Sequence, residues 1–483
     1  GGAIMDGYIT LSAKTLDDAI TEALIQLGVT SDHLDYEVIE KGSAGFLGIG
    51  MKQAVIKARR KQEKPVEEPV VEEVEEKPVK KEVKEFKEEK KDFHKKEFHK
   101  KEHVKKDNFK ILEGKRVGLI TNPTGVDNSL KSTIDILFEA PNVNLVALYG
   151  PEHGVRGDVH AGDKVENSTD PSTGLPVYSL YGKTRKPTPE MLQGIDVLVY
   201  DIQDIGCRSF TYISTMGVAM EAAAENGIEF IVLDRPNPIG GEKVEGNLVE
   251  DGYISFVSQF KIPYIYGLTC GELARMLVGE HMLAKDCKLT VVPMKHWKRS
   301  MDYTKTGLQW IPSSPHIPHP HSAYFYPLSG IVGELPYLSI GVGYTIPFQM
   351  FAAEWIDADK LADRMNKLNL PGIKFRPMHL KPFYAFGKGE HLQGVQVHIL
   401  DYKKARLSEV QFYIMQELAA LYPDKPAFCK ENESRFDMFD KVCGSNQIRE
   451  RFSKNYHFDD IKDYWYKDVE DFKKLSRKYY LYK

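Results

Sequence analysis

Residues 144–157 have the sequence NLVALYGPEHGVRG, which joins a short apolar run to a sharp turn carrying three ionisable side chains. The apolar part is too short for a helix and is typical of a buried strand. The glycines and Pro151 end the strand and let the backbone turn. Glu152, His153 and Arg156 then follow the carboxyl end of a strand, where ligands bind in open α/β sheets. The alternative is a structural turn in which Arg156 only pairs with Glu152.

Four runs rich in Val, Ile and Leu predict the strands of one sheet. They are residues 116–121, 144–150, 196–202 and 229–234. Their lack of polar–apolar alternation is expected of parallel strands that are covered on both faces. Helical patterns at 129–139 and 212–226 lie between them. The predicted fold class is therefore α/β, with a doubly wound parallel sheet.

Polar residues follow each of these runs. In chain order they are Asn122; Glu152, His153 and Arg156; Asp201, Asp204 and Arg208; and Asp234, Arg235 and Asn237. Because parallel strands end at one edge of a sheet, these side chains predict a polar cleft. Each loop alone is also consistent with helix capping or turn chemistry.

The predicted chemistry is carboxylate-based. No G-x-G-x-x-G follows a strand and no G-x-S-x-G is present, so neither a dinucleotide cofactor nor a serine hydrolase is expected. Five scattered cysteines without C-x-x-C spacing argue against a disulfide scaffold or a zinc site. The loop at 313–321, SSPHIPHPH, holds three histidines on an extended, proline-rich backbone. We assign His316 to substrate contact, with a rigid loop as the alternative, and expect no metal.

Length and composition indicate several globular domains. The chain has 483 residues, 28% of them charged, and its formal net charge of -4 does not indicate a nucleic-acid binder. No apolar run is long enough to span a bilayer, and no apolar signal-peptide core precedes the first domain. As written, the sequence predicts a cytoplasmic chain whose natural start is Met5.

Residues 8–60 predict a small βαββ unit. Strands are expected at 8–13, 35–40 and 53–59, with a helix between Thr15 and Gly28. Over residues 5–62 the unit resembles the N-terminal domain of Jag (SpoIIIJ-associated) proteins, on the motifs at 13–15, 36–38 and 45–50. Jag proteins continue into RNA-binding modules, and nothing similar follows here. The resemblance therefore implies a small adaptor domain, and no nucleic-acid partner is expected.

Residues 63–108 are mostly Lys and Glu with scattered Val, Pro and His. This composition predicts a charged linker that is disordered or partly helical. Metal capture by His94, His99 and His103 is the alternative to a solvated tether.

A second α/β region is expected from about residue 269. Helices are predicted at 270–283, 358–368, 408–422 and from 469, and strands at 288–294, 374–381 and 394–400. Five motifs stand out in residues 109–483, at 118–125, 150–154, 201–204, 212–217 and 233–241. On these motifs the region resembles the NamZ family of exo-acting β-N-acetylmuramidases, and more specifically its Bacteroidetes-type members.

The resemblance implies a Rossmann-like catalytic domain at 109–268, a smaller α/β auxiliary domain at 269–483 and a cleft between them. It implies release of terminal N-acetylmuramic acid from the non-reducing ends of peptidoglycan fragments, without a cofactor. It also places the catalytic glutamate at Glu152. Residues 339–348, SIGVGYTIPF, depart from the SEGRGTTRPF of many relatives, which bears on how the lactyl carboxylate is held. Glu334 still matches the acidic residue upstream.

Glu152 is expected to protonate the leaving glycosidic oxygen, with His153 or Arg156 positioning it. Such a general acid needs a carboxyl whose pKa is raised by burial or by a neighbouring negative charge. The candidates for the second group are Glu334, Asp201 and Asp204, in that order, or the acetamido group of the substrate. A carboxylate about 5 Å away indicates retention, and one about 6.5–9.5 Å away indicates inversion. Arg208, Arg235 and Asn237 are expected to bind sugar hydroxyls or the lactate.

The alternative function is a muropeptide-binding protein that does not cleave its ligand and uses the Jag-like unit for docking. The two resemblances also differ on location, since Jag proteins are cytoplasmic and enzymes of the NamZ type are usually exported. The sequence leaves open whether the fusion of the Jag-like unit to the NamZ-like region is natural or artificial. It also leaves the oligomeric state open.

Overall fold

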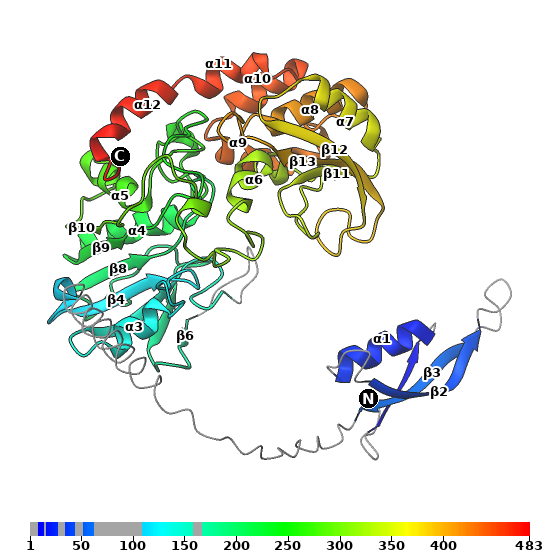
Figure 1. Cartoon of the computed structure of the whole chain (residues 1–483), viewed down its shortest axis with the longest axis horizontal. Coiled ribbons are helices and arrows are strands. Elements are labelled where there is room, and N and C mark those ends of the chain that lie inside the picture. Colours follow the sequence, from blue (N-terminus) through cyan, green and yellow to red (C-terminus); the bar gives the residue numbers. More distant parts are fainter. Residues whose placement is uncertain (1–7, 14–15, 28–33, 44–51, 62–108, 158–166) are drawn as a thin grey trace, which may run out of the picture. The chain divides into compact units, whose positions relative to one another are not determined.

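Figure 1 shows a computed structural model of the chain, which describes residues 8–13, 16–27, 34–43, 52–61, 109–157 and 167–483. The chain forms two compact units, Gly1–His94 and Lys95–Lys483. The predicted charged linker, its three histidines and the glycine-rich motif at 45–50 lie outside the described residues. No helix within the described ranges is long and apolar enough to cross a membrane.

The N-terminal unit has the predicted order of elements. These are β1 (Ile9–Ala13), α1 (Leu16–Leu27), β2 (Leu34–Ser43) and β3 (Lys52–Arg60). The sheet is antiparallel with the order β1-β3-β2. Alternation along β3 buries Ala54, Ile56 and Ala58, and the last two pack against Ala19 and Ala23 of α1.

The C-terminal unit is built on a seven-stranded sheet with the order β10-β9-β8-β4-β5-β7-β6. Its strands are β4 (Arg116–Thr121), β5 (Asn144–Gly150), β6 (Ser168–Thr169), β7 (Pro176–Ser179), β8 (Val197–Asp201), β9 (Glu229–Leu233) and β10 (Leu289–Val292). All neighbours are parallel except the pair β6–β7. The predicted parallel sheet is confirmed, and β10 extends it with residues from beyond position 268.

Helices cover both faces of this sheet because its strands are apolar on both sides. Leu119 and Val199 share one cluster with Ile134 of α3 (Thr133–Glu139). Ile120 and Tyr200 pack on the other face, in the cluster that includes α4 (Tyr212–Glu225) and α5 (Cys270–Gly279).

Two of these helices are shorter than predicted, for local reasons. Leu130 has φ 66°, so α3 begins only after Ser132, whose hydroxyl accepts the N–H of Asp135. Helix α5 is shortened at its C-terminal end instead. It stops at Gly279, and His281, two residues later, has a left-handed φ of 51°.

The smaller region contains an antiparallel sheet with the order β11-β13-β12, formed by Met350–Ala353, Leu392–Ile399 and Ile373–Leu380. Helices α6 (Ser322–Ser329), α7 (Ala358–Lys367) and α8 (Val410–Leu421) accompany it. Next come α9 (Phe436–Cys443), α10 (Gln447–Asn455), α11 (Asp459–Tyr466) and α12 (Val469–Ser476). Short 3-10 helices occur at Lys110–Leu112, Asp251–Tyr253, Tyr303–Lys305, Val332–Glu334, Lys430–Arg435 and Arg477–Tyr479.

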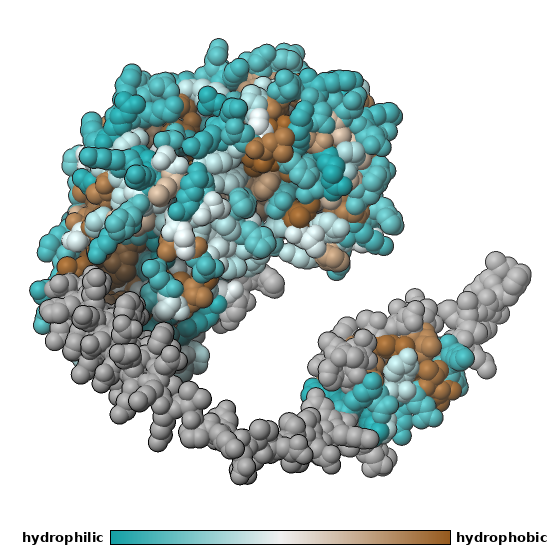
Figure 2. All heavy atoms as spheres, viewed as in Figure 1, coloured by the Kyte–Doolittle hydropathy of each residue, from teal (hydrophilic) through white to brown (hydrophobic). Residues whose placement is uncertain are grey.

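The C-terminal helices connect the smaller sheet to the larger one. Figure 1 shows α10, α11 and α12 running from the smaller sheet back to α5. Figure 2 shows that their outer surface is mostly hydrophilic, while Phe452 and Trp465 are buried on the inner side. A single hydrophobic cluster includes Ile120 of the large sheet, Val395 of the small sheet and Trp465. The two regions therefore share one core.

Candidate active site

Glu152 lies in a tight turn at the carboxyl end of β5. Gly154 donates its N–H to the carbonyl of Pro151 at 2.9 Å, and His153 adopts a left-handed φ of 72°. A Cβ on Gly150 would lie 3.1 Å from the nitrogen of Val155, so the strand needs a small residue at this exit. The turn thus fixes the backbone from which the Glu152 side chain projects.

Two hydroxyl groups hold the half-buried carboxylate of Glu152. Thr211 is the N-cap residue of α4 but does not cap the helix with its side chain; its Oγ1 donates to Glu152 Oε2 at 2.7 Å. The hydroxyl of Tyr181, which follows β7, also hydrogen-bonds to Glu152.

Three tyrosines respond to the charge of Glu152. Burial is the main cause that raises the pKa of Tyr181, Tyr212 and Tyr326, and the Glu152 carboxylate raises each of them further. These phenols therefore stay neutral at ordinary pH, and they surround Glu152 with groups that donate hydrogen bonds without carrying charge. Asn122 acts in the opposite direction on the pKa of Tyr212, so its side chain lies near the same cluster.

Glu334 approaches this cluster from the smaller region, in the 3-10 helix Val332–Glu334. Its Oε2 forms an ion pair with Arg435 Nη2 at 2.6 Å, and Arg435 Nε also donates to the Glu334 carbonyl at 2.9 Å. Burial raises the pKa of the Glu334 carboxyl, and Arg435 opposes that rise. For Tyr326, both Glu334 and Glu152 raise the pKa of the phenol, which places Tyr326 within electrostatic reach of the two carboxylates.

Arg156 does not pair with Glu152. Its Nη2 and Nε both donate to Asp170 Oδ1, at 2.6 and 2.9 Å, and the side chain stays 37% exposed. His153 is buried next to Glu152 in sequence. The alternative of an Arg156–Glu152 ion pair is therefore wrong.

Asp201 and Arg235 form a buried pair that joins the exits of β8 and β9. Arg235 Nε donates to Asp201 Oδ1 at 2.6 Å and its Nη2 to Oδ2 at 3.0 Å. Thr133 adds a bond to Asp201 Oδ2 at 2.6 Å. Both carboxylate oxygens are occupied, so this pair holds the strand exits together.

Arg208 and Asn237 are also committed to the protein. Arg208 has no exposed surface and donates to the main-chain carbonyls of Asn247, Ile262 and Val442 at 2.7–2.9 Å. Asn237 is 4% exposed and bonds to the Leu268 carbonyl. A side chain without accessible surface does not contact a sugar, so the expected sugar-binding role of Arg208 does not fit the structure.

Asp204 and Asp234 are buried carboxyls outside the tyrosine cluster. Burial raises the pKa of each to about 6, although both accept hydrogen bonds that act in the opposite direction. Asp204 accepts from the hydroxyl of Tyr266, and Asp234 from those of Thr269 and Tyr482. Both carboxyls stabilise the loops behind the site.

His316 lies in the proline-rich loop and contacts a different loop from the one carrying Glu152. Its Nε2 is 2.5 Å from the Tyr384 hydroxyl. Ser313 of the same loop accepts a hydrogen bond from Tyr212, which links the loop to the tyrosine cluster. Within the described residues, no three His, Cys, Asp or Glu side chains come together to hold a metal ion.

Sequence reasoning missed four residues of this site. Thr211, Tyr181, Tyr326 and Arg435 come from four separate elements, and no motif connects them. Thr211 directly precedes the predicted helix at 212–226, and that position was the only signal that could have marked it.

Comparisons with known proteins find different relatives for the N-terminal and C-terminal parts of the chain. A family model described as Jag N-terminus matches residues 11–60. The RNA-binding protein KhpB is 58% identical over 62 residues in Clostridium symbiosum and 41% identical over 54 residues in Bacillus subtilis. The matched part covers 28% and 26% of these two relatives.

The C-terminal unit matches two family models, "Exo-beta-N-acetylmuramidase NamZ" N-terminal over residues 117–321 and C-terminal over residues 324–482. Peptidoglycan beta-N-acetylmuramidase NamZ of Bacillus subtilis is 45% identical over 373 residues, which are 77% of this chain and 88% of the relative. Two crystal structures of DUF1343 family proteins from Bacteroides fragilis are similar. One is 76% identical with a TM-score of 0.76, covering 79% of this chain and 98% of that one. The other is 29% identical with a TM-score of 0.61, covering 78% and 97%. The chain therefore belongs to the NamZ family of exo-β-N-acetylmuramidases.

Proposed function

We propose that this glycoside hydrolase releases terminal β-linked N-acetylmuramic acid from the non-reducing ends of peptidoglycan fragments. The Bacillus subtilis relative is named a peptidoglycan beta-N-acetylmuramidase and matches 77% of the chain, and the two matching family models are described as exo-acting. The observation that carries the proposal is the half-buried Glu152 carboxylate at the exit of β5, held by Thr211 and Tyr181. A carboxyl in such a polar, partly closed setting is suited to proton transfer with a glycosidic oxygen.

In this mechanism Glu152 is the general acid. Thr211 and Tyr181 donate to the carboxylate and fix its rotamer, so the proton is delivered in one direction. As the glycosidic bond breaks, the leaving sugar takes the proton and Glu152 becomes ionised at the N-terminus of α4. The role of His153 in this scheme is to fix the turn, because it is buried with a left-handed backbone.

Glu152→Gln tests this role with two substrates. For a MurNAc–GlcNAc disaccharide, whose leaving group needs protonation, we expect kcat/KM to fall by about 10²–10⁴-fold. For a nitrophenyl glycoside of MurNAc, whose leaving group departs without a proton, the loss should be smaller. Glu354→Gln is the matched control, since Glu354 is exposed and distant in sequence from every site residue. Near-native activity of Glu152→Gln on the disaccharide would exclude Glu152 as the acid. Binding without sugar release by the unmodified chain would favour the muropeptide-binding alternative.

Glu334 is the proposed second carboxylate. Asp201 is occupied by Arg235 and Thr133, and Asp204 is 6% exposed, whereas the Glu334 side chain keeps 29% of its surface accessible. Arg435 favours the ionised form of Glu334, as a nucleophile or base requires.

Glu334→Ala tests this assignment through azide rescue. We expect activity on both substrates to fall by about 10³-fold. Added azide should restore turnover with the α-glycosyl azide as the product, because azide replaces the missing nucleophile or the activated water. A variant that keeps its activity, or that forms no α-glycosyl azide, would transfer the role to the acetamido group of the substrate. The product anomer formed by the unmodified enzyme then separates retention from inversion.

Arg156 and His316 are predicted binding residues that keep accessible surface, and we assign substrate contact to them. The buried residues Asn122, Asp201, Asp234 and Asn237 would act by holding the loops around the site, together with Arg235, whose side chain is 18% exposed. No cofactor is assigned.

The N-terminal unit is proposed to serve as an adaptor without RNA binding of its own. Its KhpB relatives are named RNA-binding proteins, but the matched part is about a quarter of their length. Filter binding with single-stranded RNA at low salt tests this proposal. A salt-dependent complex formed by the full chain would contradict it.

A further inference from the structure

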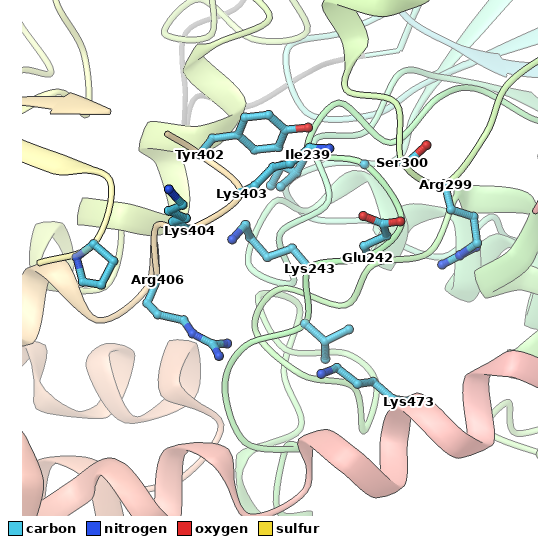
Figure 3. Close-up of a pocket in the computed structure, with 13 residues that line it drawn as sticks. Ile239, Glu242, Lys243, Arg299, Ser300, Tyr402, Lys403, Lys404, Arg406 and Lys473 are labelled. Carbon is cyan, nitrogen blue, oxygen red and sulfur yellow. The ribbon is translucent and has the colours of Figure 1, made fainter. Parts of the chain in front are cut away.

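A cavity lies between the two regions of the C-terminal unit and is lined by residues other than those assigned to hydrolysis. Its volume is about 460 Å³, which lies in the range of small-molecule sites. Figure 3 shows that its labelled side chains come from the loop after β9, the segment after β10, the turn after β13 and α12. No residue predicted for catalysis or substrate binding lines it.

The lining of this cavity is strongly basic. It includes six Lys and Arg residues, Lys243, Arg299, Lys403, Lys404, Arg406 and Lys473, and one acid, Glu242. Four of the cations have nearby carboxylates. Arg299 pairs with Glu272 at 2.6 Å, Lys404 with Asp401 at 3.4 Å, Lys473 with Glu470 at 2.9 Å and Lys243 with Glu245 at 3.7 Å.

The other two cations, Lys403 and Arg406, are not compensated by a nearby carboxylate among the described residues. Within the described part of the chain, no carboxylate lies within 4 Å of the Lys403 ammonium or the Arg406 guanidinium. The Arg406 group instead lies 5.6 Å from the centre of the Tyr466 ring. A guanidinium that retains its hydrogen-bond donors is suited to bidentate contact with a carboxylate or phosphate.

Lys243 shows that these charges act on one another. Its side chain is 11% exposed, and its ammonium donates to the Ala405 carbonyl at 2.6 Å and lies 3.7 Å from Glu245. Burial lowers the pKa of Lys243, Glu245 opposes this, and the positive charge of Arg406 lowers it further. The positive charges of Lys243 and Arg406 therefore repel each other, and an anion bound between them would relieve this repulsion.

We propose that this cavity binds a small oxyanion with two or more negative charges, held by Arg406, Lys403 and Lys243. Arg406 would contact two of its oxygens through the guanidinium fork, while the two ammonium groups supply further donors. The limited volume of the cavity favours a small molecule over a polymer. Both phosphate esters and polycarboxylates share this chemistry, and the site is separate from the proposed hydrolytic residues.

Calorimetric titration of the full chain tests the proposal, with inorganic pyrophosphate and citrate as probes for the two sources. Saturable binding of either probe that weakens as salt rises is expected, since the contacts are ionic. Tighter binding of pyrophosphate would identify the phosphate class, and tighter binding of citrate the carboxylate class. Failure of both probes to bind at low salt would overturn the proposal.

Variants locate the binding. Arg406→Gln and Lys403→Gln should each weaken binding of the preferred probe by about ten-fold or more, because each removes a charged donor. Lys374→Gln is the matched control, since Lys374 is an exposed lysine on β12 outside the cavity, and it should bind like the unmodified chain. Thermal melting and hydrolysis of the nitrophenyl glycoside confirm that the variants are folded. Equal affinity in Arg406→Gln, Lys403→Gln and Lys374→Gln would overturn the assignment of the site.

Discussion

Two aspartates of the C-terminal unit should contribute to stability with opposite dependence on pH. Asp204 is fully enclosed, and burial raises its pKa from 3.8 to about 6. Its protonated form is therefore favoured by folding, so the stability it contributes is complete below pH 3.8 and is lost as pH rises through 6. Asp196 is the reverse case. Hydrogen bonds from Arg116 lower its pKa to about 2, and its contribution is present above 3.8 and lost as pH falls towards 2.

Unfolding by urea measures these contributions. The difference in unfolding free energy between the unmodified chain and Asp204→Asn should decrease by about 2–3 kcal/mol from pH 4 to pH 7, as the linkage of a two-unit pKa shift requires. The same difference for Asp196→Asn, the control, should stay nearly flat over that range. A flat profile for Asp204→Asn would show that Asp204 is ionised at neutral pH without cost.

At this scale the sequence located the polar loops but not the role of each side chain. Glu152 could be singled out because a strand end and a turn are local signals. Arg208 could not be recognised as structural, because one of its acceptors is the carbonyl of Val442, 234 positions away. Likewise, nothing near Asp201 in the sequence shows that Arg235 and Thr133 occupy its two oxygens. Burial of this kind depends on contacts between distant segments.

Among the elements, the loop between β12 and β13 presents aromatic rings next to the loop that carries His316. Phe383 is 66% exposed and stacks on Tyr344 at 5.7 Å, and Tyr384 bonds to His316. Tyr344 belongs to the segment that departs from the family pattern. Exposed rings in this position are suited to stacking on a sugar. The His316 loop, which Tyr384 contacts, is linked through Ser313 to the tyrosine cluster.

Phe383→Ala is therefore expected to raise KM for the disaccharide by about three- to ten-fold, with little change in kcat, because stacking acts on binding. Steady-state kinetics of the two substrates measure this, and the nitrophenyl glycoside, which has one sugar, should be affected less. Phe138→Ala, on an exposed aromatic of α3, is the control. An unchanged KM in Phe383→Ala would remove this loop from substrate binding.

The elements that the sequence predicted best are those with strong local signals, such as continuous apolar runs. The four apolar runs became β4, β5, β8 and β9 within one residue at each end. Strands β6 and β7 were missed because they have two and four residues, and β7 begins with Pro176. Helix α6 was missed because it contains Pro327, which normally interrupts a helix. Its burial against the shared core outweighs that local preference.

On the scale of the whole molecule, the two units should fold independently. The N-terminal unit has its own hydrophobic cluster, drawn only from residues between Ile9 and Ala58. The clusters of the C-terminal unit begin at Phe109. In addition, a Bacteroides fragilis chain of known structure is matched over 98% of its length by 79% of this chain, so a protein of this fold exists without the added domain. Each cluster supplies its own cooperativity.

A chain shortened to residues 109–483 should thus keep the kcat/KM of the full protein on the disaccharide within about two-fold, and the melting temperature of its main transition within about 2 °C, because no core residue of the C-terminal unit is removed. Calorimetry of the full chain should show the same main transition with a second, smaller one from the N-terminal unit. The matched control is the N-terminal segment, residues 5–62, which should reproduce that smaller transition alone. A shortened chain that melts several degrees lower, or that loses activity, would mean that the N-terminal unit stabilises the hydrolase and acts as more than an independent adaptor.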